Sequence, residues 1–389
     1  MYNKPMAKKP PFRGKICRKP FEYFEIGTPR EGRVPCYSCC PTILPNITGD
    51  LAKQSLDEIW NSEEYKKIRA SILDGSYKYC RTDLCPEIQS DNLLDIGAIE
   101  DPSILDAYFN QKLELESRPK EINLSYDQSC NLACPSCRED FITSPEESQK
   151  AHLDKITNEL LNRDLSDTKV IACSSGDPFV GEYFKKFLYE LEGSEHEGLK
   201  IQIMTNGVLF NKRAWEKMYK IHSQIEMVCI SIDAATEETY GITRKGGSWK
   251  LLMENLQFLS LLRERGEIPF LRIDFVVQDH NYQEIPAFIK LGEKLKVDQV
   301  FFQKVANWGT FSQEEYEKRC IYSESHPQFN EFYKVITSKE LKKPIVNPGN
   351  FGHWIGPVHK DHRFNWRNAI IHSLRKRLRL WKVMGLKRE

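Results

Sequence analysis

Residues 121–137 read EINLSYDQSCNLACPSC: an alternating apolar run followed at once by three cysteines, Cys130, Cys134 and Cys137. The alternation over 121–126 predicts a β-strand. The cysteine spacing is C-x3-C-x2-C, and three thiolates this close together can ligate three corners of a four-iron cluster. The fourth iron then keeps an open position for another ligand. A structural zinc ion would need a fourth protein ligand, for which only Asp140 stands nearby.

Strand and helix patterns alternate on the C-terminal side of this stretch. Six repeats of strand and helix imply parallel strands joined by right-handed crossovers. The predicted strands are 121–126, 169–173, 200–205, 226–232, 270–277 and 298–303, and the helices between them are 148–161, 184–191, 212–221, 249–262 and 283–295. A doubly wound sheet and an incomplete barrel both fit. Because polar signatures follow the strands, where barrel enzymes carry their chemistry, we predict an α/β fold with a partial (β/α)6 TIM-like barrel.

Three segments are predicted: a cysteine-rich region over 1–112 with one helix near 56–72, the barrel over 113–310, and a helical extension over 311–389. Lys and Arg number 56 against 55 Asp and Glu, so the charge balance gives no sign of a nucleic-acid partner. No apolar run approaches the roughly 18 residues of a membrane span, and the basic N-terminus lacks the apolar core of a secretory signal. We therefore expect a cytoplasmic protein.

The twelve cysteines are clustered, which indicates metal ligands in a reducing compartment more than disulfides. Three lie in the loop at 130–137 and three are scattered. The other six precede residue 90: Cys17, Cys36, Cys39, Cys40, Cys80 and Cys85. The N-terminal group predicts a second metal centre.

The three-cysteine loop, placed after the first of six strand–helix repeats, resembles the radical S-adenosylmethionine (SAM) superfamily. The resemblance implies that SAM chelates the open iron through its methionine amine and carboxylate. One-electron cleavage of SAM then gives a 5′-deoxyadenosyl radical that abstracts hydrogen from a substrate. The chain departs from the family at Ser136, where an aromatic residue that packs under the adenine is usual.

Later strand ends carry further signatures of the same resemblance. The sequence Ser175-Gly176-Asp177 is similar to the family's Gly-Gly-Glu loop, and Asn206 stands in a Thr-Asn-Gly sequence. The resemblance implies cofactor contacts by these residues and by Ser231, Asp233, Arg244 and Gln278. A guanidinium suits a carboxylate, since it can bond both oxygens. The structural alternatives are ordinary strand-to-helix turns and, at Thr236, a helix N-cap.

The N-terminal region is similar to the SPASM or twitch auxiliary-cluster domains, which share the sequence Leu-Asp-Glu-Ile-Trp-Asn found at 56–61 and a closing pair of cysteines. In most relatives this domain follows the barrel. The resemblance implies one auxiliary [4Fe–4S] cluster on Cys17, Cys40, Cys80 and Cys85, with Cys36 or Cys39 as substitutes. A zinc-stabilised module is the alternative.

The same resemblance suggests a peptide, protein or glycan-linked substrate and an electron donor such as flavodoxin or ferredoxin. Cys173, Cys229 and Tyr126 are candidate hydrogen-atom donors, although packing alone explains such buried residues. From Trp366 the chain has a basic amphipathic pattern, which suits either packing or peripheral membrane contact. The alternative to catalysis is a non-catalytic iron–sulfur or zinc-binding scaffold, which the changes at Ser136 and in the Gly-Gly-Glu loop permit.

Overall fold

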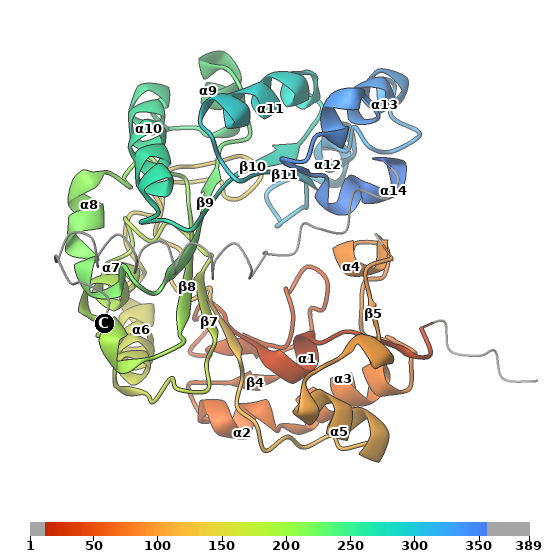
Figure 1. Ribbon diagram of the computed structural model, residues 1–389, viewed down its shortest axis with the longest axis vertical. Coiled ribbons are helices and arrows are strands. Elements are labelled where there is room, and N and C mark those ends of the chain that lie inside the picture. Colours follow the sequence, from red (N-terminus) through yellow and green to blue (C-terminus); the bar gives the residue numbers. More distant parts are fainter. Residues whose placement is uncertain (1–11, 90, 356–389) are drawn as a thin grey trace, which may run out of the picture. The chain divides into compact units, whose positions relative to one another are not determined.

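The computed structural model describes residues 12–89 and 91–355, which form two compact units (Figure 1). Among these described residues, the first unit comprises 12–128, 145–175 and 196–199, and the second comprises 129–144, 176–195 and 200–355. The first unit therefore extends past the boundary predicted at residue 112 and includes two of the strands predicted for the barrel.

The first unit is built on a five-stranded sheet. Its strand order is β7-β6-β2-β3-β4, with β2 parallel to β6, β6 parallel to β7, and the pairs β2–β3 and β3–β4 antiparallel. The strands are β2 (Tyr23–Ile26), β3 (Pro35–Tyr37), β4 (Gly49–Asp50), β6 (Glu121–Leu124) and β7 (Val170–Cys173). A short antiparallel pair, β1 (Lys15–Ile16) and β5 (Leu94–Asp95), lies outside this sheet. The helices are α1 (Lys19–Glu22), α2 (Leu56–Trp60), α3 (Glu63–Leu73), α4 (Pro86–Gln89), α5 (Pro102–Asn110) and α6 (Glu147–Asn162).

The helix predicted near 56–72 is two helices, α2 and α3, because Ser62 starts a second N-cap by accepting the backbone N–H of Tyr65. The first is closed at its start by a capping box between Ser55 and Glu58.

The fully buried Arg69 connects α3 to three other segments of this unit through hydrogen bonds. Its guanidinium donates to Asn61 Oδ1 and to the backbone oxygens of Pro20, Trp60 and Leu113, and it stacks on the Trp60 ring at 4.5 Å. No described carboxylate pairs with it, so burial lowers its pKa to about 10. Trp60 and Asn61, the last two residues of the Leu-Asp-Glu-Ile-Trp-Asn sequence, thus have a structural role in this unit through their contacts with Arg69.

The second unit has five parallel strands in the order β8-β9-β10-β11-β12. They are β8 (Lys200–Thr205), β9 (Ile225–Ser231), β10 (Phe270–Val277), β11 (Gln299–Lys304) and β12 (Val346–Asn347). The helices are α7 (Glu182–Glu190), α8 (Lys212–Lys217), α9 (Glu237–Thr243), α10 (Trp249–Arg265), α11 (Ile285–Lys294), α12 (Gln313–Arg319), α13 (Phe329–Ile336) and α14 (Gly352–Ile355). Figure 1 shows α8, α10 and α11 along one side of these strands.

The two faces of these five strands differ. Alternate residues such as Ile273, Phe275 and Phe302 are fully buried, and Phe275 packs on Phe288 of α11 with ring centroids 4.8 Å apart. On the opposite face, Ser231 and Arg272 are only half-buried. The helices therefore bury one face and leave polar side chains on the other.

All six predicted strands are present, and the molecule is an α/β protein with mostly parallel strands. Two predicted helices are shorter than expected: 212–221 is α8 followed by a 3-10 turn, and 283–295 begins with one. In the extension, α12, α13 and α14 are helical, whereas the basic segment from Trp366 lies outside the described residues. None of the described helices is long and apolar enough to cross a membrane.

Candidate functional site

The three-cysteine loop belongs to the second unit and is closed at its base by a backbone bond from Cys130 N–H to the Ile142 oxygen at 2.5 Å. Within it, the N–H groups of Cys137 and Arg138 both donate to the Cys134 oxygen, at 2.8 and 3.0 Å. Cys130 and Cys134 are buried and Cys137 is exposed. The backbone thus turns tightly around Cys134.

The segment that follows α9 holds this loop in place. Ala133 N–H donates to the Lys245 oxygen at 3.0 Å. Gly246 has φ +88°, and a β-carbon there would lie 2.5 Å from the Phe141 ring. A glycine is therefore required both by the backbone conformation and by the close approach of Phe141.

Arg244 connects the loop to the end of β9. Its Nη2 forms an ion pair with Asp233 Oδ2 at 2.6 Å, and its Nη1 donates to Cys134 Sγ at 3.8 Å. Burial works against the charge of Arg244, but Asp233 and Cys134 outweigh it and raise the arginine pKa above its usual value. The arginine is consequently a permanent cation beside the cysteine loop.

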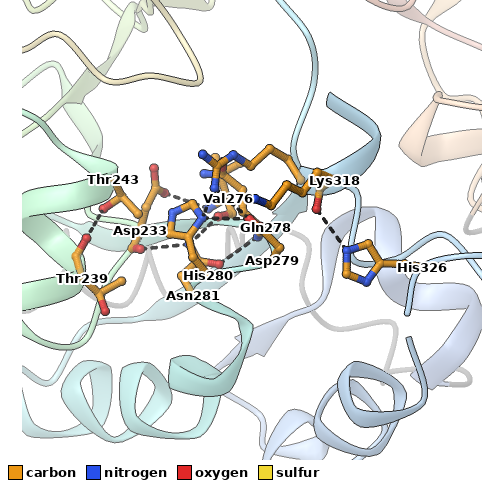
Figure 2. A network of polar contacts seen from close by, with 11 residues as sticks. Asp233, Thr239, Thr243, Val276, Gln278, Asp279, His280, Asn281, Lys318 and His326 are labelled. Carbon is orange, nitrogen blue, oxygen red and sulfur yellow. Dashed lines mark hydrogen bonds and ion pairs between the residues drawn. The ribbon is translucent and has the colours of Figure 1, made fainter. Parts of the chain in front are cut away.

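Asp233 is itself fixed by the next strand end. It has φ +61°, and its Oδ1 accepts Val276 N–H at 2.7 Å (Figure 2). Asn281 Nδ2 donates to the Asp233 backbone oxygen at 3.1 Å, while Asn281 Oδ1 accepts Gln278 N–H at 2.8 Å. Asp233 thus acts here as the counter-ion that positions Arg244.

Asn206, after β8, supplies a donor to the other buried cysteine. Its Nδ2 lies 3.7 Å from Cys130 Sγ and 2.9 Å from Asn131 Oδ1. Each buried cysteine of the loop therefore has a side-chain N–H donor, Asn206 from the end of β8 and Arg244 from the C-terminal end of α9. Such donors orient metal-ligating sulfurs and tune bound iron–sulfur clusters. The sequence indicated Asn206 and Arg244, but as cofactor contacts; their proximity to the thiols was not predicted.

Asp177 ties three strand ends together. Its carboxylate accepts bonds from Thr205 Oγ1 at 2.6 Å, Asn206 N–H at 2.9 Å and Phe179 N–H at 3.0 Å. Its own N–H donates to the Ser129 oxygen at 2.7 Å. Both carboxylate oxygens thus contact the protein, and this residue positions the Thr-Asn-Gly turn next to the cysteine loop.

The remaining predicted cofactor contacts occupy strand ends. Ser231 is half-buried at the end of β9, Gln278 is buried after β10, and Gly176 has φ +55°. Ser175 is the last residue of a first-unit segment, and Gly176 begins the next second-unit segment. The structure therefore places Asn206 and Arg244 in direct contact with the loop, Asp233 behind Arg244, and Ser231 and Gln278 at strand ends.

The thiols of this loop are suited to metal binding only after deprotonation. Burial raises the pKa of Cys130 to about 11, and it also raises that of Cys134, against the opposing effect of Arg244. Bound metal must displace these protons. Among the described residues, no three His, Cys, Asp or Glu side chains converge as they would on a single metal ion. Three thiols in one closed loop, with N–H donors to two of them, fit an iron–sulfur cluster.

A second thiol group lies within the first unit. Cys17, Cys39, Cys80 and Cys85 line one small cavity, walled mainly by apolar side chains such as Ile72 and Tyr77. Three of these were predicted as auxiliary ligands. Cys39, predicted as a substitute, lines the cavity, and Cys40 is not among the lining residues.

The cysteines outside this cavity have other partners. Cys40 Sγ lies 3.0 Å from Thr42 Oγ1, and the buried Cys36 thiol donates to the Val34 oxygen at 3.8 Å. Both contacts are local in sequence. Cys36 lies within β3 and Cys40 in the turn that follows it.

The cavity thiols share a buried environment. Burial raises the pKa of Cys17 to about 12 and that of Cys80 to about 11. Lys19, which also lines the cavity, acts on Cys17 and Cys39 in the opposite sense. Four thiols and a cation around one cavity fit a cluster with four cysteine ligands.

Both groups together define a protein with two candidate iron–sulfur sites, one in each unit. Residues 126–291 match the model of the Radical SAM superfamily. Residues 17–86 match the model of the SPASM iron–sulfur cluster-binding domain, which therefore precedes the radical SAM region as predicted. No curated protein matches the chain.

Similar solved structures have low sequence identity to this chain. SuiB of Streptococcus suis is 13% identical, with 69% of this chain and 58% of that chain covered and a TM-score of 0.44. TYW1 with a lysine-pyruvate adduct is 20% identical, with coverage of 48% and 64% and a TM-score of 0.34. Native anSMEcpe with bound AdoMet is 17% identical, with coverage of 58% and 58% and a TM-score of 0.41. The matched regions span 58% to 64% of the lengths of these three proteins.

The two family models support a radical SAM enzyme of the SPASM type. They imply a [4Fe–4S] cluster that works with SAM and an auxiliary iron–sulfur cluster, in agreement with the cofactors predicted from the sequence.

Proposed function

We propose that this protein abstracts hydrogen from a peptide, protein or glycan-linked substrate, with Cys130, Cys134 and Cys137 holding the catalytic cluster. When bound, the cluster and SAM would supply the 5′-deoxyadenosyl radical. The observation that carries the proposal is the contact of Arg244 with Cys134 and of Asn206 with Cys130. These contacts place fixed donors around the two buried thiols of a loop whose third thiol is exposed.

The chain's own residues then act by holding the loop. Asp177 fixes the Thr205–Asn206 turn, so that the Asn206 amide stays on Cys130. Asp233 fixes Arg244 against Cys134 and leaves its guanidinium within reach of an anionic ligand at the loop. Within the second unit, Ser231, Gln278 and Gly176 are proposed as further contacts of SAM.

The second part of the proposal is an auxiliary cluster on Cys17, Cys39, Cys80 and Cys85. The cavity lined by these four thiols supports it. The choice of substrate class rests on the SPASM match alone. Flavodoxin or ferredoxin is proposed as the electron donor, and a partial barrel as the full architecture of residues 113–310.

The test is SAM cleavage by anaerobically reconstituted full-length protein with dithionite, beside a Cys130/Cys134/Cys137→Ala variant. The proposal expects 5′-deoxyadenosine from the wild type only, and loss of about four irons in the variant. A reconstituted wild type that holds this cluster but forms no 5′-deoxyadenosine would identify the non-catalytic scaffold instead. Tightly bound zinc with little iron would contradict both iron–sulfur assignments.

A further inference from the structure

Beside the three-cysteine loop lies a buried tyrosine whose hydroxyl has no hydrogen-bond partner among the described residues. Tyr240 of α9 is 1% exposed, and its Oη has no acceptor or donor in the described chain. A buried hydroxyl without a partner is costly, and native proteins rarely retain one unless a ligand satisfies it.

The ring of Tyr240 is fixed, so the hydroxyl cannot turn away. It packs on Trp249 with centroids 5.4 Å apart, and a β-carbon on Gly247 would lie only 2.5 Å from Tyr240 Oη. The absence of a side chain at 247 is thus what makes room for this hydroxyl.

The residues that follow Tyr240 place its hydroxyl at the loop. Arg244, one helical turn further along the chain, donates to Cys134 Sγ at 3.8 Å, and the Lys245 oxygen accepts Ala133 N–H at 3.0 Å. Gly247, which lies beside the hydroxyl, continues the same segment. The Nε of Arg244 is a second buried donor without a described partner in this segment.

We infer that Tyr240 is a positioning residue that donates a hydrogen bond to a sulfur atom of the cluster held by Cys130, Cys134 and Cys137. The inference rests on the proposed function, because it assumes a cluster at this loop. A donor stabilises the reduced cluster, which is more negative, over the oxidised one, and so raises the reduction potential. From the sequence, no residue was expected to donate a hydrogen bond to a sulfur atom of the cluster.

The test compares Tyr240→Phe with wild type in the full-length reconstituted protein, by a redox titration followed by electron paramagnetic resonance without SAM. The signal of this cluster is the one that a Cys130/Cys134/Cys137→Ala variant lacks. The expected result is about a tenfold loss of reduced cluster at a fixed potential, equivalent to about 59 mV for one electron. Gly247→Ala, which displaces the hydroxyl without removing it, should shift the potential in the same direction.

Tyr282→Phe is the matched control, because Tyr282 is also 1% exposed but its hydroxyl donates to Glu331 at 3.1 Å. This variant should leave the potential unchanged and lower the stability of the apo-protein. Tyr240→Phe should leave apo-protein stability unchanged or raise it, since it loses no described partner and removes a buried hydroxyl that lacks one.

Three outcomes would overturn the inference. An unchanged SAM-free potential with weaker SAM binding to Tyr240→Phe would assign the hydroxyl to the cofactor carboxylate. Apo-protein destabilised as much by Tyr240→Phe as by Tyr282→Phe would reveal a partner within the chain. An equal potential shift in Tyr282→Phe would show that any buried hydroxyl has this effect. Absence of the cluster signal in wild type would instead defeat the proposed function.

Discussion

The Arg244 guanidinium donates to the sulfur of Cys134 across 3.8 Å, although the two residues are 110 positions apart in the chain. The cation lies at the C-terminal end of α9 and the thiol lies in the three-cysteine loop, so two separate segments make the contact. Asp233 completes it as the counter-ion of the arginine. The electrostatics of the three-cysteine loop are therefore set by residues outside it.

Replacement of Asp233 by asparagine should destabilise the apo-protein by about 3 kcal/mol, because it leaves Arg244 buried without its counter-ion. Asparagine tolerates the left-handed backbone conformation that Asp233 adopts, so strain does not confuse the comparison. Urea unfolding measures the change. Glu293→Gln, which breaks the exposed pair with Lys343, should cost under about 1 kcal/mol. Equal effects of the two variants would refute the claim that the buried pair is special.

Cys39→Ser should remove about four irons from the reconstituted protein, and Cys40→Ser should not. The reason is that Cys39 lines the cavity with Cys17, Cys80 and Cys85, while Cys40 contacts Thr42. Iron and acid-labile sulfide analysis of both variants gives the answer. Iron loss in Cys40→Ser but not in Cys39→Ser would instead support the ligand set predicted from the sequence, which contains Cys40.

Arg69→Met should destabilise the protein by about 3 kcal/mol, since it leaves three backbone oxygens without their donor and leaves Asn61 Oδ1 with Leu115 N–H alone. The unfolding midpoint in urea should fall accordingly. Arg81→Met provides the control, because Arg81 forms an exposed pair with Asp83 and should cost little. A midpoint that falls only slightly in Arg69→Met would mean that the contacts of Arg69 with Trp60 and Asn61 add no stability.

We expect the protein to lose stability in acid as the carboxylate of Asp279 becomes protonated. Burial opposes its ionisation, but bonds from His280 and Arg319 (3.0 Å from Arg319 Nη1) prevail and lower its pKa to about 2 (Figure 2). A carboxyl group with a lowered pKa stabilises the fold above its unfolded pKa, near 3.8, and this contribution disappears as the pH falls through 2. The contribution at neutral pH is about 2 kcal/mol.

Apo-protein unfolding followed from pH 5 to pH 2 tests this last prediction. Asp279→Asn should be less stable than wild type at pH 5, and the difference should shrink toward pH 2. A difference that stays constant over this range would show that ionisation of Asp279 contributes nothing.

The sequence alone determined the elements and the metal-binding loop. The bounds of strands such as 200–205 and 270–277 were predicted as the structure has them. The reason is that alternation between a buried and a half-exposed face appears as alternation of apolar and polar residues along the chain. The spacing of Cys130, Cys134 and Cys137 is equally local, so the sequence alone predicted the loop as a candidate cluster site and showed its resemblance to a family.

Only the tertiary structure decided which side chains meet. Whether Cys39 or Cys40 faces the cavity depends on the turn after β3, and adjacent residues in such a turn point in different directions. The contact of Arg244 with Cys134, and the bond from Val276 N–H to Asp233, depend on how segments far apart in the sequence align at the strand ends. That alignment is a property of long-range packing, which the pattern of neighbouring residues does not contain.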